Sequence, residues 1–459
     1  MHIGRRQLLG GSGALAIGAA LPAKAAAAET DWKLLGEDVK AEMAWAWDEY
    51  RRLAWGKDEI KPVSGGFSSF PLKRGHLGLS LVEALDTLWV MGLDSRFQDG
   101  LAWVKANLDF AVDGEVSVFE TSIRFLGGLL SAHHASGDPV VLAKAKNLAD
   151  RLLPAFATPT GMPRRTINLR TGQAKGNVSS PAEIGTFLPE WGTLSRLTGD
   201  PRYATAAKRA VTALFERRSK LGLFATEIDV TTGAWRSRRT TIGPYCDSFF
   251  EYLWDSWQLL GDADCKRMYE ASLAAILRHQ QVWQGGGLWF ADVDFETGKV
   301  LDTSQNELAA FFGGLLAQGG ALREGAAYTE SWAGVQDRYG ILPEVYDFKS
   351  GAAKRAANGL VPELADSAYH LWLIDGRPRW RELLRTHYLN MKRRQKARHG
   401  YTQLSSVTTK RQGDRCPGYW WSEQMKYYYL AFADTPRFDY KKNYLSTEGN
   451  VLLGLKRAA

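Results

Sequence analysis

Acidic residues near the beginnings of successive predicted helices are the side chains in this chain best placed to do chemistry. Glu120 is followed one helical turn later by Arg124, and Asp247 directly precedes a run of aromatic residues. Glu307 and Glu423 also lie among apolar residues, and a charge in such surroundings indicates a side chain that faces a cavity. The complete set of these early-helix acids is Glu83, Glu120, Glu183, Asp247, Glu307, Glu363 and Glu423.

Two carboxyl groups on opposite sides of a sugar can hydrolyse a glycosidic bond. One stays protonated and donates to the leaving oxygen, while the other is ionised and takes a proton from water. A separation of about 6.5–9.5 Å leaves room for that water and inverts the anomeric centre. Further carboxylates could bind hydroxyl groups or a hard cation that prefers oxygen ligands. Histidine chemistry fits less well, because the eight histidines fall at the middles or ends of the predicted helices.

Fourteen amphipathic or apolar segments must position these acids, and they are arranged as seven pairs of helices. Glycines that end the first helix of a pair fall at 92, 137, 199, 261, 319 and 376. The spacing between them is 45, 62, 62, 58 and 57 residues, which is typical of an internal repeat of one helical hairpin and its connection.

Long connections lead from one pair to the next, and several share one turn sequence. Residues 168–172, 229–233, 294–298 and 347–351 each run from Asn or Asp to Gly between alternating apolar residues. This pattern predicts short β-hairpins with glycine turns. Because the connections all enter the first helices, we expect hairpins and acids to gather at one mouth of an all-α barrel of seven helical hairpins.

Composition and charge limit the classes of function. The formal net charge is +8, or +5 without residues 1–28, and no dense Lys/Arg stripe is present, so we do not expect nucleic-acid binding. The apolar fraction of 45% suffices for a large core. Cys246, Cys265 and Cys416 lack a CxxC spacing, which argues against zinc; export would permit one disulfide and leave one cysteine free.

Residues 1–28 have the pattern of a bacterial export signal. Arg5 and Arg6 precede a short apolar run from Gly13 to Leu21, which is typical of the twin-arginine route and too short for a convincing spanning helix. Ordinary secretion and retention as an anchor are the alternatives. We therefore expect residues 29–459 to form a single catalytic barrel in the periplasm or outside the cell. We expect a monomer without stable membrane association.

Several motifs resemble the glycoside hydrolase family 47 α-1,2-mannosidases. The longest are LVEALDTLWVMGL at residues 81–93 and VFETSIRFLGGLL at residues 118–130. The other matching motifs are 158–163, 182–190, 247–253, 362–363, 423–427 and 446–448. They follow the family's order from about residue 35 to residue 450.

The resemblance implies an (α/α)7 barrel and an inverting, calcium-dependent exo-α-1,2-mannosidase. It implies that Glu120 protonates the leaving group through water, that Glu363 is the general base, and that Asp247 is another essential carboxylate. Thr447 would bind Ca2+ through its carbonyl and hydroxyl oxygens, at the tip of a C-terminal hairpin that plugs the barrel. The candidate substrate-binding residues are Arg124, Glu183, Glu307, Glu423, Glu448 and Phe312. The substrate would be an α-mannoside or a high-mannose glycan.

Some positions depart from the family pattern near the expected sugar-binding mouth. Val361 stands where the family usually has Arg, Glu307 where it often has His, and Pro417-Gly418 where it has Glu-Ser. A lectin-like barrel that binds mannose glycans without cleaving them is the alternative that these departures leave open. A sugar epimerase is a poorer alternative, because it would need a pair of histidines in the cavity.

Overall fold

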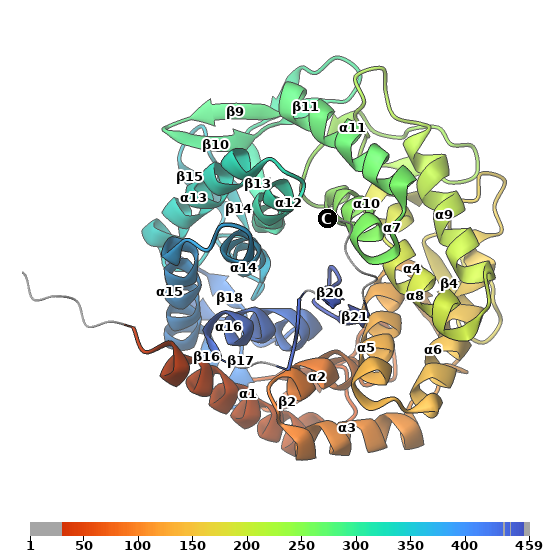
Figure 1. Ribbon diagram of the computed structural model, residues 1–459, viewed down its shortest axis with the longest axis vertical. Coiled ribbons are helices and arrows are strands. Elements are labelled where there is room, and N and C mark those ends of the chain that lie inside the picture. Colours follow the sequence, from red (N-terminus) through yellow and green to blue (C-terminus); the bar gives the residue numbers. More distant parts are fainter. Residues whose placement is uncertain (1–29, 435–436, 441, 454–459) are drawn as a thin grey trace, which may run out of the picture. The chain divides into compact units, whose positions relative to one another are not determined.

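A computed structural model describes residues 30–434, 437–440 and 442–453. The compact unit Trp32–Ala459 consists of an inner and an outer ring of helices around a common axis (Figure 1). The predicted leader at residues 1–28 lies outside the described residues. None of the described helices combines the length and the apolar character that crossing a membrane requires.

The outer ring is built from amphipathic helices. In α9, for example, Tyr203, Ala207, Val211 and Leu214 recur at helical spacing and are buried against the inner ring, while Thr205 and Arg209 are exposed. The outer helices are α1 (Trp32–Ala54), α3 (Asp94–Asn107), α6 (Pro139–Leu152) with η2 (Leu153–Phe156), α9 (Arg202–Phe215), α11 (Ala263–His279), α13 (Leu322–Tyr339) and α15 (Pro378–Gln395).

The inner ring is apolar nearly all round, because its helices pack against the outer ring and against each other. Figure 1 shows these segments surrounding the axis, where the C-terminal hairpin also lies. The inner helices are α2 (Leu79–Val90), α4 (Val118–Glu120) with η1 (Thr121–Leu126) and α5 (Gly127–Ser136), α7 (Pro181–Gly185) with α8 (Leu188–Thr198), α10 (Asp247–Leu260), η3 (Glu307–Phe311) with α12 (Phe312–Gln318), α14 (Glu363–Asp375), and η4 (Trp420–Gln424) with α16 (Met425–Phe432).

The ring closes between the first and last helices of the unit. α1 packs along α16, and the indole of Trp32 stacks on the phenyl group of Phe432 with a centroid distance of 5.7 Å. The remaining helices pair as the repeat predicted. The predicted all-α barrel of seven helical hairpins is therefore confirmed.

Glycines end most inner helices as predicted. Gly137, Gly199, Gly261 and Gly376 are left-handed C-caps, a conformation that costs glycine no Cβ clash. The predicted stop at residue 319 is displaced by one residue, because Gly319 has φ −79° and its neighbour Gly320 has φ +94°.

The four predicted glycine turns share one geometry. In each, the glycine N–H donates to the carbonyl of the Asn or Asp four residues earlier, at 2.7–2.9 Å. The side-chain oxygen of that Asn or Asp accepts N–H groups inside the same turn, which is why this residue type begins it. These turns close short antiparallel pairings on the connections, as expected.

The strands form small antiparallel sheets and hairpins, each of two or three strands. They are β1 (Glu59–Lys61) with β2 (Gly66–Ser68); β3 (Glu115–Ser117), β4 (Thr166–Asn168) and β5 (Ala174–Lys175); β6 (Val178–Ser179) with β7 (Ile228–Asp229); β8 (Arg239–Thr240), β11 (Asp292–Asp294) and β12 (Val300–Asp302); β9 (Gln281–Gln284) with β10 (Gly287–Phe290); β13 (Ser304–Asn306), β14 (Val345–Asp347) and β15 (Ala352–Arg355); β16 (Lys396–Ala397) with β17 (Gly400–Tyr401); β18 (Leu404–Ser406) with β19 (Arg411–Gln412); and β20 (Asn443–Leu445) with β21 (Val451–Leu453).

Inner helices depart from regular α-helical geometry where they begin. η1 and η4 are π-helical, η3 is a 3-10 helix, and the third inner segment breaks between α7 and α8. Such irregular turns shift side chains out of the regular helical positions and are frequent at functional sites. Helical periodicity does not predict them. Their position makes this mouth of the barrel the place to look for chemistry.

Candidate active site

A cavity of about 810 Å3 lies between the long connections and the N-terminal ends of the inner helices. Six of the seven early-helix acids line it, and they come from six different inner segments. They are Glu120, Glu183, Asp247, Glu307, Glu363 and Glu423. The expected convergence of these side chains on one mouth of the barrel is what the structure shows.

Arg124 organises one wall of the cavity. Its Nε donates to Glu120 Oε2 at 2.7 Å, and its Nη1 donates to Glu83 Oε1 at 3.1 Å and to Glu448 Oε2 at 2.5 Å. Its guanidinium lies 5.6 Å from the ring centroid of Tyr419. These contacts fix the direction in which the Glu120 carboxylate points.

Glu83 is the early-helix acid that does not line the cavity. It is fully buried behind Arg124, and burial raises its pKa to about 7 while the Arg124 charge opposes that rise. Its carboxyl occupies the space beside Gly418, where an added Cβ would lie only 1.5 Å from Glu83 Oε2. Because Gly418 has no side chain, it leaves room for the Glu83 carboxyl.

Asp247 and Glu363 lie in surroundings that disfavour their ionised forms. Burial raises the pKa of Asp247 to about 7, and the charge of Glu120 adds to the rise. Burial raises the pKa of Glu363 well above its usual range, with Glu307 and Asp247 adding repulsion. Glu363 Oε2 has no hydrogen-bond partner among the described residues. An acid whose pKa lies near neutrality can exchange protons at physiological pH, as general catalysis requires.

The floor of the cavity is formed by the tip of the β20–β21 hairpin. Thr447 and Glu448 line the cavity there together with Glu251, whose pKa burial raises to about 8. Glu423 approaches the same tip from η4. Burial raises the pKa values of Glu423 and Glu448 well above the usual range. Repulsion from Glu448 and Glu363 adds to the rise for Glu423, and repulsion from Glu83 and Glu120 adds to the rise for Glu448.

A buried ion pair holds this hairpin in the barrel. Lys426 Nζ donates to both carboxylate oxygens of Asp86 at 2.8 Å, and the two side chains are 0% and 1% exposed. Lys426 also donates to the carbonyl of Gly449, and Asp86 Oδ2 accepts the N–H of Val451 at 2.8 Å. The pair therefore bonds to the turn at Gly449 and to the first residue of β21 at Val451, and so holds the segment that directly follows Thr447.

Sequence reasoning missed three carboxyls in the cavity: Glu344, on the connection that leads into α14, and the helical residues Glu251 and Asp366. Glu251 follows Asp247 by four residues, and Asp366 follows Glu363 by three. Both spacings place side chains on one face of a helix. Applying that rule to the predicted acids would have found Glu251 and Asp366, but not Glu344, which lies outside the helices.

Glu307 and Phe312 differ from what was expected of them. Glu307 lines the cavity, but its oxygens accept Asn358 Nδ2 at 2.7 Å and the Gly359 N–H at 3.2 Å, so it also holds the segment before Glu363. The prediction that Phe312 faces the sugar is wrong, because its ring is fully buried and packs on Phe290 at 5.3 Å. Phe311 lines the cavity instead, since successive residues of a helix point about 100–120° apart.

The cavity carries an excess of acidic groups. Ten lining side chains are carboxylic acids, and the two cationic ones are Arg124 and Arg415. Among the described residues, no three His, Cys, Asp or Glu side chains are arranged as direct metal ligands. The Thr447 oxygens, with carboxylates that could act through water, nevertheless fit a hard cation. Its charge would offset the repulsion that, together with burial, raises the pKa values of Glu423 and Glu448.

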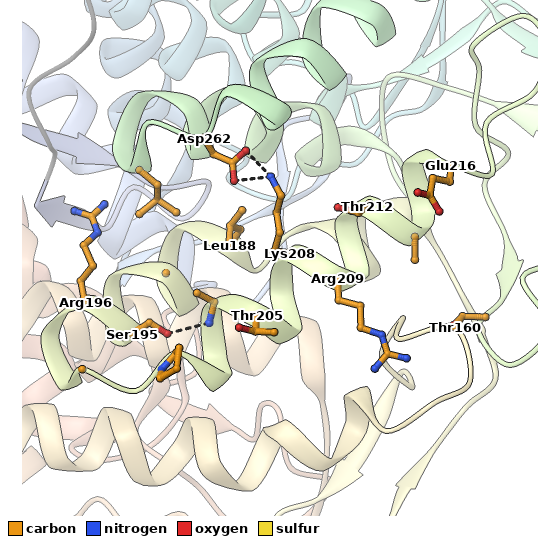
Figure 2. Close-up of a pocket in the computed structure, with 16 residues that line it drawn as sticks. Thr160, Leu188, Ser195, Arg196, Thr205, Lys208, Arg209, Thr212, Glu216 and Asp262 are labelled. Atoms are coloured by element: carbon orange, nitrogen blue, oxygen red, sulfur yellow. Dashed lines mark hydrogen bonds and ion pairs between the residues drawn. The ribbon is translucent and has the colours of Figure 1, made fainter.

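A second cavity, of about 1010 Å3, lies between α8, α9 and the turn that follows α10. Figure 2 shows Lys208 paired with Asp262 there, and Ser195 accepting a backbone N–H at 2.9 Å. Its acids do not converge, so the smaller cavity is the one suited to carboxylate chemistry. The three cysteines are free and buried.

Comparison with known proteins agrees with this geometry. The sequence model of the family described as "Glycosyl hydrolase family 47" matches residues 42–453 of this chain. The chain is 33% identical to "Alpha-mannosidase I MNS5" of Arabidopsis thaliana, over 92% of this chain and 78% of that protein. It is also 33% identical to "Mannosyl-oligosaccharide 1,2-alpha-mannosidase IB" of Mus musculus, over 92% and 70%. The solved alpha-1,2-mannosidase from Trichoderma reesei matches with a TM-score of 0.82 at 26% identity, over 92% of this chain and 99% of that chain.

Proposed function

Since the chain belongs to glycosyl hydrolase family 47, we propose that it hydrolyses terminal α-1,2-linked mannose from mannosides or high-mannose glycans, with inversion and with a requirement for calcium. The observation that carries this proposal is the convergence of Glu120, Asp247 and Glu363 on one cavity. The names of the relatives give the substrate class.

Glu363 is the proposed general base. Its Oε2 is shielded and has no partner among the described residues, so a water molecule can donate to it without displacing an existing bond. Burial, with repulsion from the neighbouring carboxyls, raises its pKa and hence its basicity once it is ionised. In this assignment Glu363 takes the proton of the water that attacks the anomeric carbon.

Glu120 is the proposed acid. Arg124 holds its carboxyl at 2.7 Å and fixes its direction, so that it can pass a proton through water to the leaving oxygen. Asp247 is the other essential carboxyl of the proposal, and its raised pKa allows it to hold a proton near pH 7. After each turnover the proton gained by Glu363 must return to the acid side, which exchange with solvent allows.

Thr447 would hold the calcium ion through its hydroxyl and carbonyl oxygens, with Glu423 and Glu448 oriented toward bound water. The ion would supply positive charge at the floor and a place for two adjacent hydroxyls of the mannose ring. The chain's own contribution is the Lys426–Asp86 pair, which keeps the Thr447 turn in register.

The test is mannose release from α-1,2-mannobiose by the purified protein, with calcium and with a chelator, and with α-1,3- and α-1,6-mannobiose as linkage controls. We expect release from the α-1,2 isomer alone and its loss on chelation. Glu363→Gln keeps the shape of the side chain and should lower kcat by at least about a thousandfold while mannobiose binding remains. Calcium-dependent binding without any product in the parent protein would instead support the lectin-like alternative.

Export from a bacterial cell remains a prediction from residues 1–28, and N-terminal sequencing of the protein recovered from its native host tests it. The monomeric state is likewise a prediction, which sedimentation of the purified protein tests.

A further inference from the structure

A strained turn at the mouth of the cavity carries an exposed tyrosine. Residues 243–246 form a β-turn closed by the Cys246 N–H donating to the Gly243 carbonyl at 3.0 Å. Pro244 occupies the second position, and Tyr245 occupies the third with φ +83°. This is the pattern of a type II turn, whose third position normally requires glycine.

Folding gains little from a tyrosine at this position. The residue is 51% exposed, no described aromatic ring packs on it, and its hydroxyl has no hydrogen-bond partner among the described residues. A positive φ is a genuine outlier for a bulky side chain and carries a cost in stability. Glycine would fit the turn without that cost. The fold therefore does not explain the aromatic side chain, and we look for a functional role.

Its position supplies such a reason. Tyr245 lines the cavity and precedes Asp247 by two residues. Its carbonyl accepts the N–H of Ala182 at 2.9 Å, which ties the turn to α7, the helix that carries Glu183. Thr447 and Glu423 lie at the closed end of the same cavity, where Glu423 is only 7% exposed. The tyrosine thus stands at the open end, on a fixed support.

We propose that Tyr245 is the platform on which the sugar of the leaving group stacks, and that it thereby sets the enzyme's preference for mannobiose and longer mannosides. The inference rests on the proposed function, in which the terminal mannose occupies the closed end. The next sugar must then lie toward the mouth. A mannose ring presents C–H groups on one face, which the electron-rich face of an aromatic ring attracts. Because the tyrosine has two side-chain torsions and a fixed backbone, little conformational entropy is lost on binding.

The experiment compares Tyr245→Gly, Tyr245→Phe and Trp283→Ala with the parent protein. Trp283 is the matched control, because it is 54% exposed on β9 and does not line the cavity. Two substrates separate the roles: α-1,2-mannobiose has a leaving sugar, and α-mannosyl fluoride has none. The midpoint of thermal unfolding is measured for every variant.

We expect Tyr245→Gly to lower kcat/KM for mannobiose by about tenfold, the change expected when one aromatic face loses its contact. The same variant should change kcat/KM for the fluoride by less than about twofold, and its unfolding midpoint should stay equal or rise, because glycine relieves the turn. Tyr245→Phe should stay within about twofold of the parent on both substrates. Trp283→Ala should match the parent throughout.

Two results would overturn the proposal. One is an unchanged kcat/KM of Tyr245→Gly for mannobiose, and the other is an equal loss on both substrates, which would place the tyrosine in the catalytic geometry. If the parent hydrolyses neither substrate, the proposed function fails instead. Calorimetry with mannobiose and free mannose then decides the platform: a selective loss of mannobiose affinity in Tyr245→Gly supports it, and equal affinities in parent and variant refute it.

Discussion

The buried pair of Lys426 and Asp86 offers the sharpest test of how the C-terminal hairpin is held. Both side chains are removed from solvent, and each also bonds to the hairpin backbone, at Gly449 and Val451. Burial alone lowers the pKa of Lys426, and the Asp86 charge opposes that change. The perturbation consists of Lys426→Met, Asp86→Asn and the double substitution.

The structure gives the size of the effects. Charges 2.8 Å apart attract by ~6 kcal/mol at an effective dielectric constant of 20, and the cost of removing them from water offsets much of this. Either single substitution leaves one buried charge without its partner, which costs about 3–5 kcal/mol. The double substitution leaves no unpaired charge and loses mainly the Gly449 hydrogen bond, which costs about 1–3 kcal/mol.

The assay is urea unfolding followed by the fluorescence of the 17 tryptophans, together with calorimetry of calcium binding. We expect each single variant to lose more stability than the double variant, and to bind calcium more weakly because the Thr447 turn is displaced. If the two single losses add up to the double loss within about 0.5 kcal/mol, the side chains do not act as a pair and the reasoning is refuted. Unchanged calcium affinity in both single variants would show that the pair does not position Thr447.

Two further outcomes are expected. Gly418→Ala should lower stability by about 1–3 kcal/mol and reduce kcat/KM, because its Cβ would displace the Glu83 carboxyl. Adding Glu83→Asp to this variant shortens the displaced side chain and should restore part of both losses. A Gly418→Ala variant that equals the parent in thermal unfolding and kinetics would contradict the contact. Glu190 is fully buried with a pKa raised by burial to about 8, so its contribution to stability is present below about pH 4.5 and is lost as the pH rises through about 8. Glu190→Gln can still accept from Tyr252 and should remove up to about 1.4 kcal/mol per pH unit from the slope of unfolding free energy between pH 5 and 8; equal slopes in both proteins would count against the buried acid.

Periodicity and turn chemistry predicted most of the fold. Inner helices are ended by left-handed glycines, and the Asp347–Gly351 turn and its three counterparts are closed by side-chain oxygens that can be read from the sequence. Both features depend on local backbone preferences, which a single chain segment already expresses. The ring closure of α1 on α16 followed from the count of helices rather than from any local signal.

The details of the site were harder to predict, because they depend on contacts between distant segments. Glu83 was expected at the cavity and instead lies behind Arg124, in space that Gly418 leaves free. Phe312 is buried and Phe311 lines the cavity, at a helix start that is 3-10 rather than α-helical. At an irregular helix start, a shift of one residue along the sequence decides whether a side chain faces the cavity or the core. Hydrophobic patterning cannot distinguish two neighbouring apolar residues in this way.

The most direct test of the central claim is the anomeric form of the first product. Hydrolysis of α-1,2-mannobiose by the purified protein with calcium is followed by proton NMR, fast enough to precede mutarotation. An attack by water on the side of Glu363, opposite to the leaving oxygen, must release β-mannose first. The account predicts a β signal that decays into the equilibrium mixture. Initial release of α-mannose would show retention and contradict the assignment of Glu363 as a base that activates water.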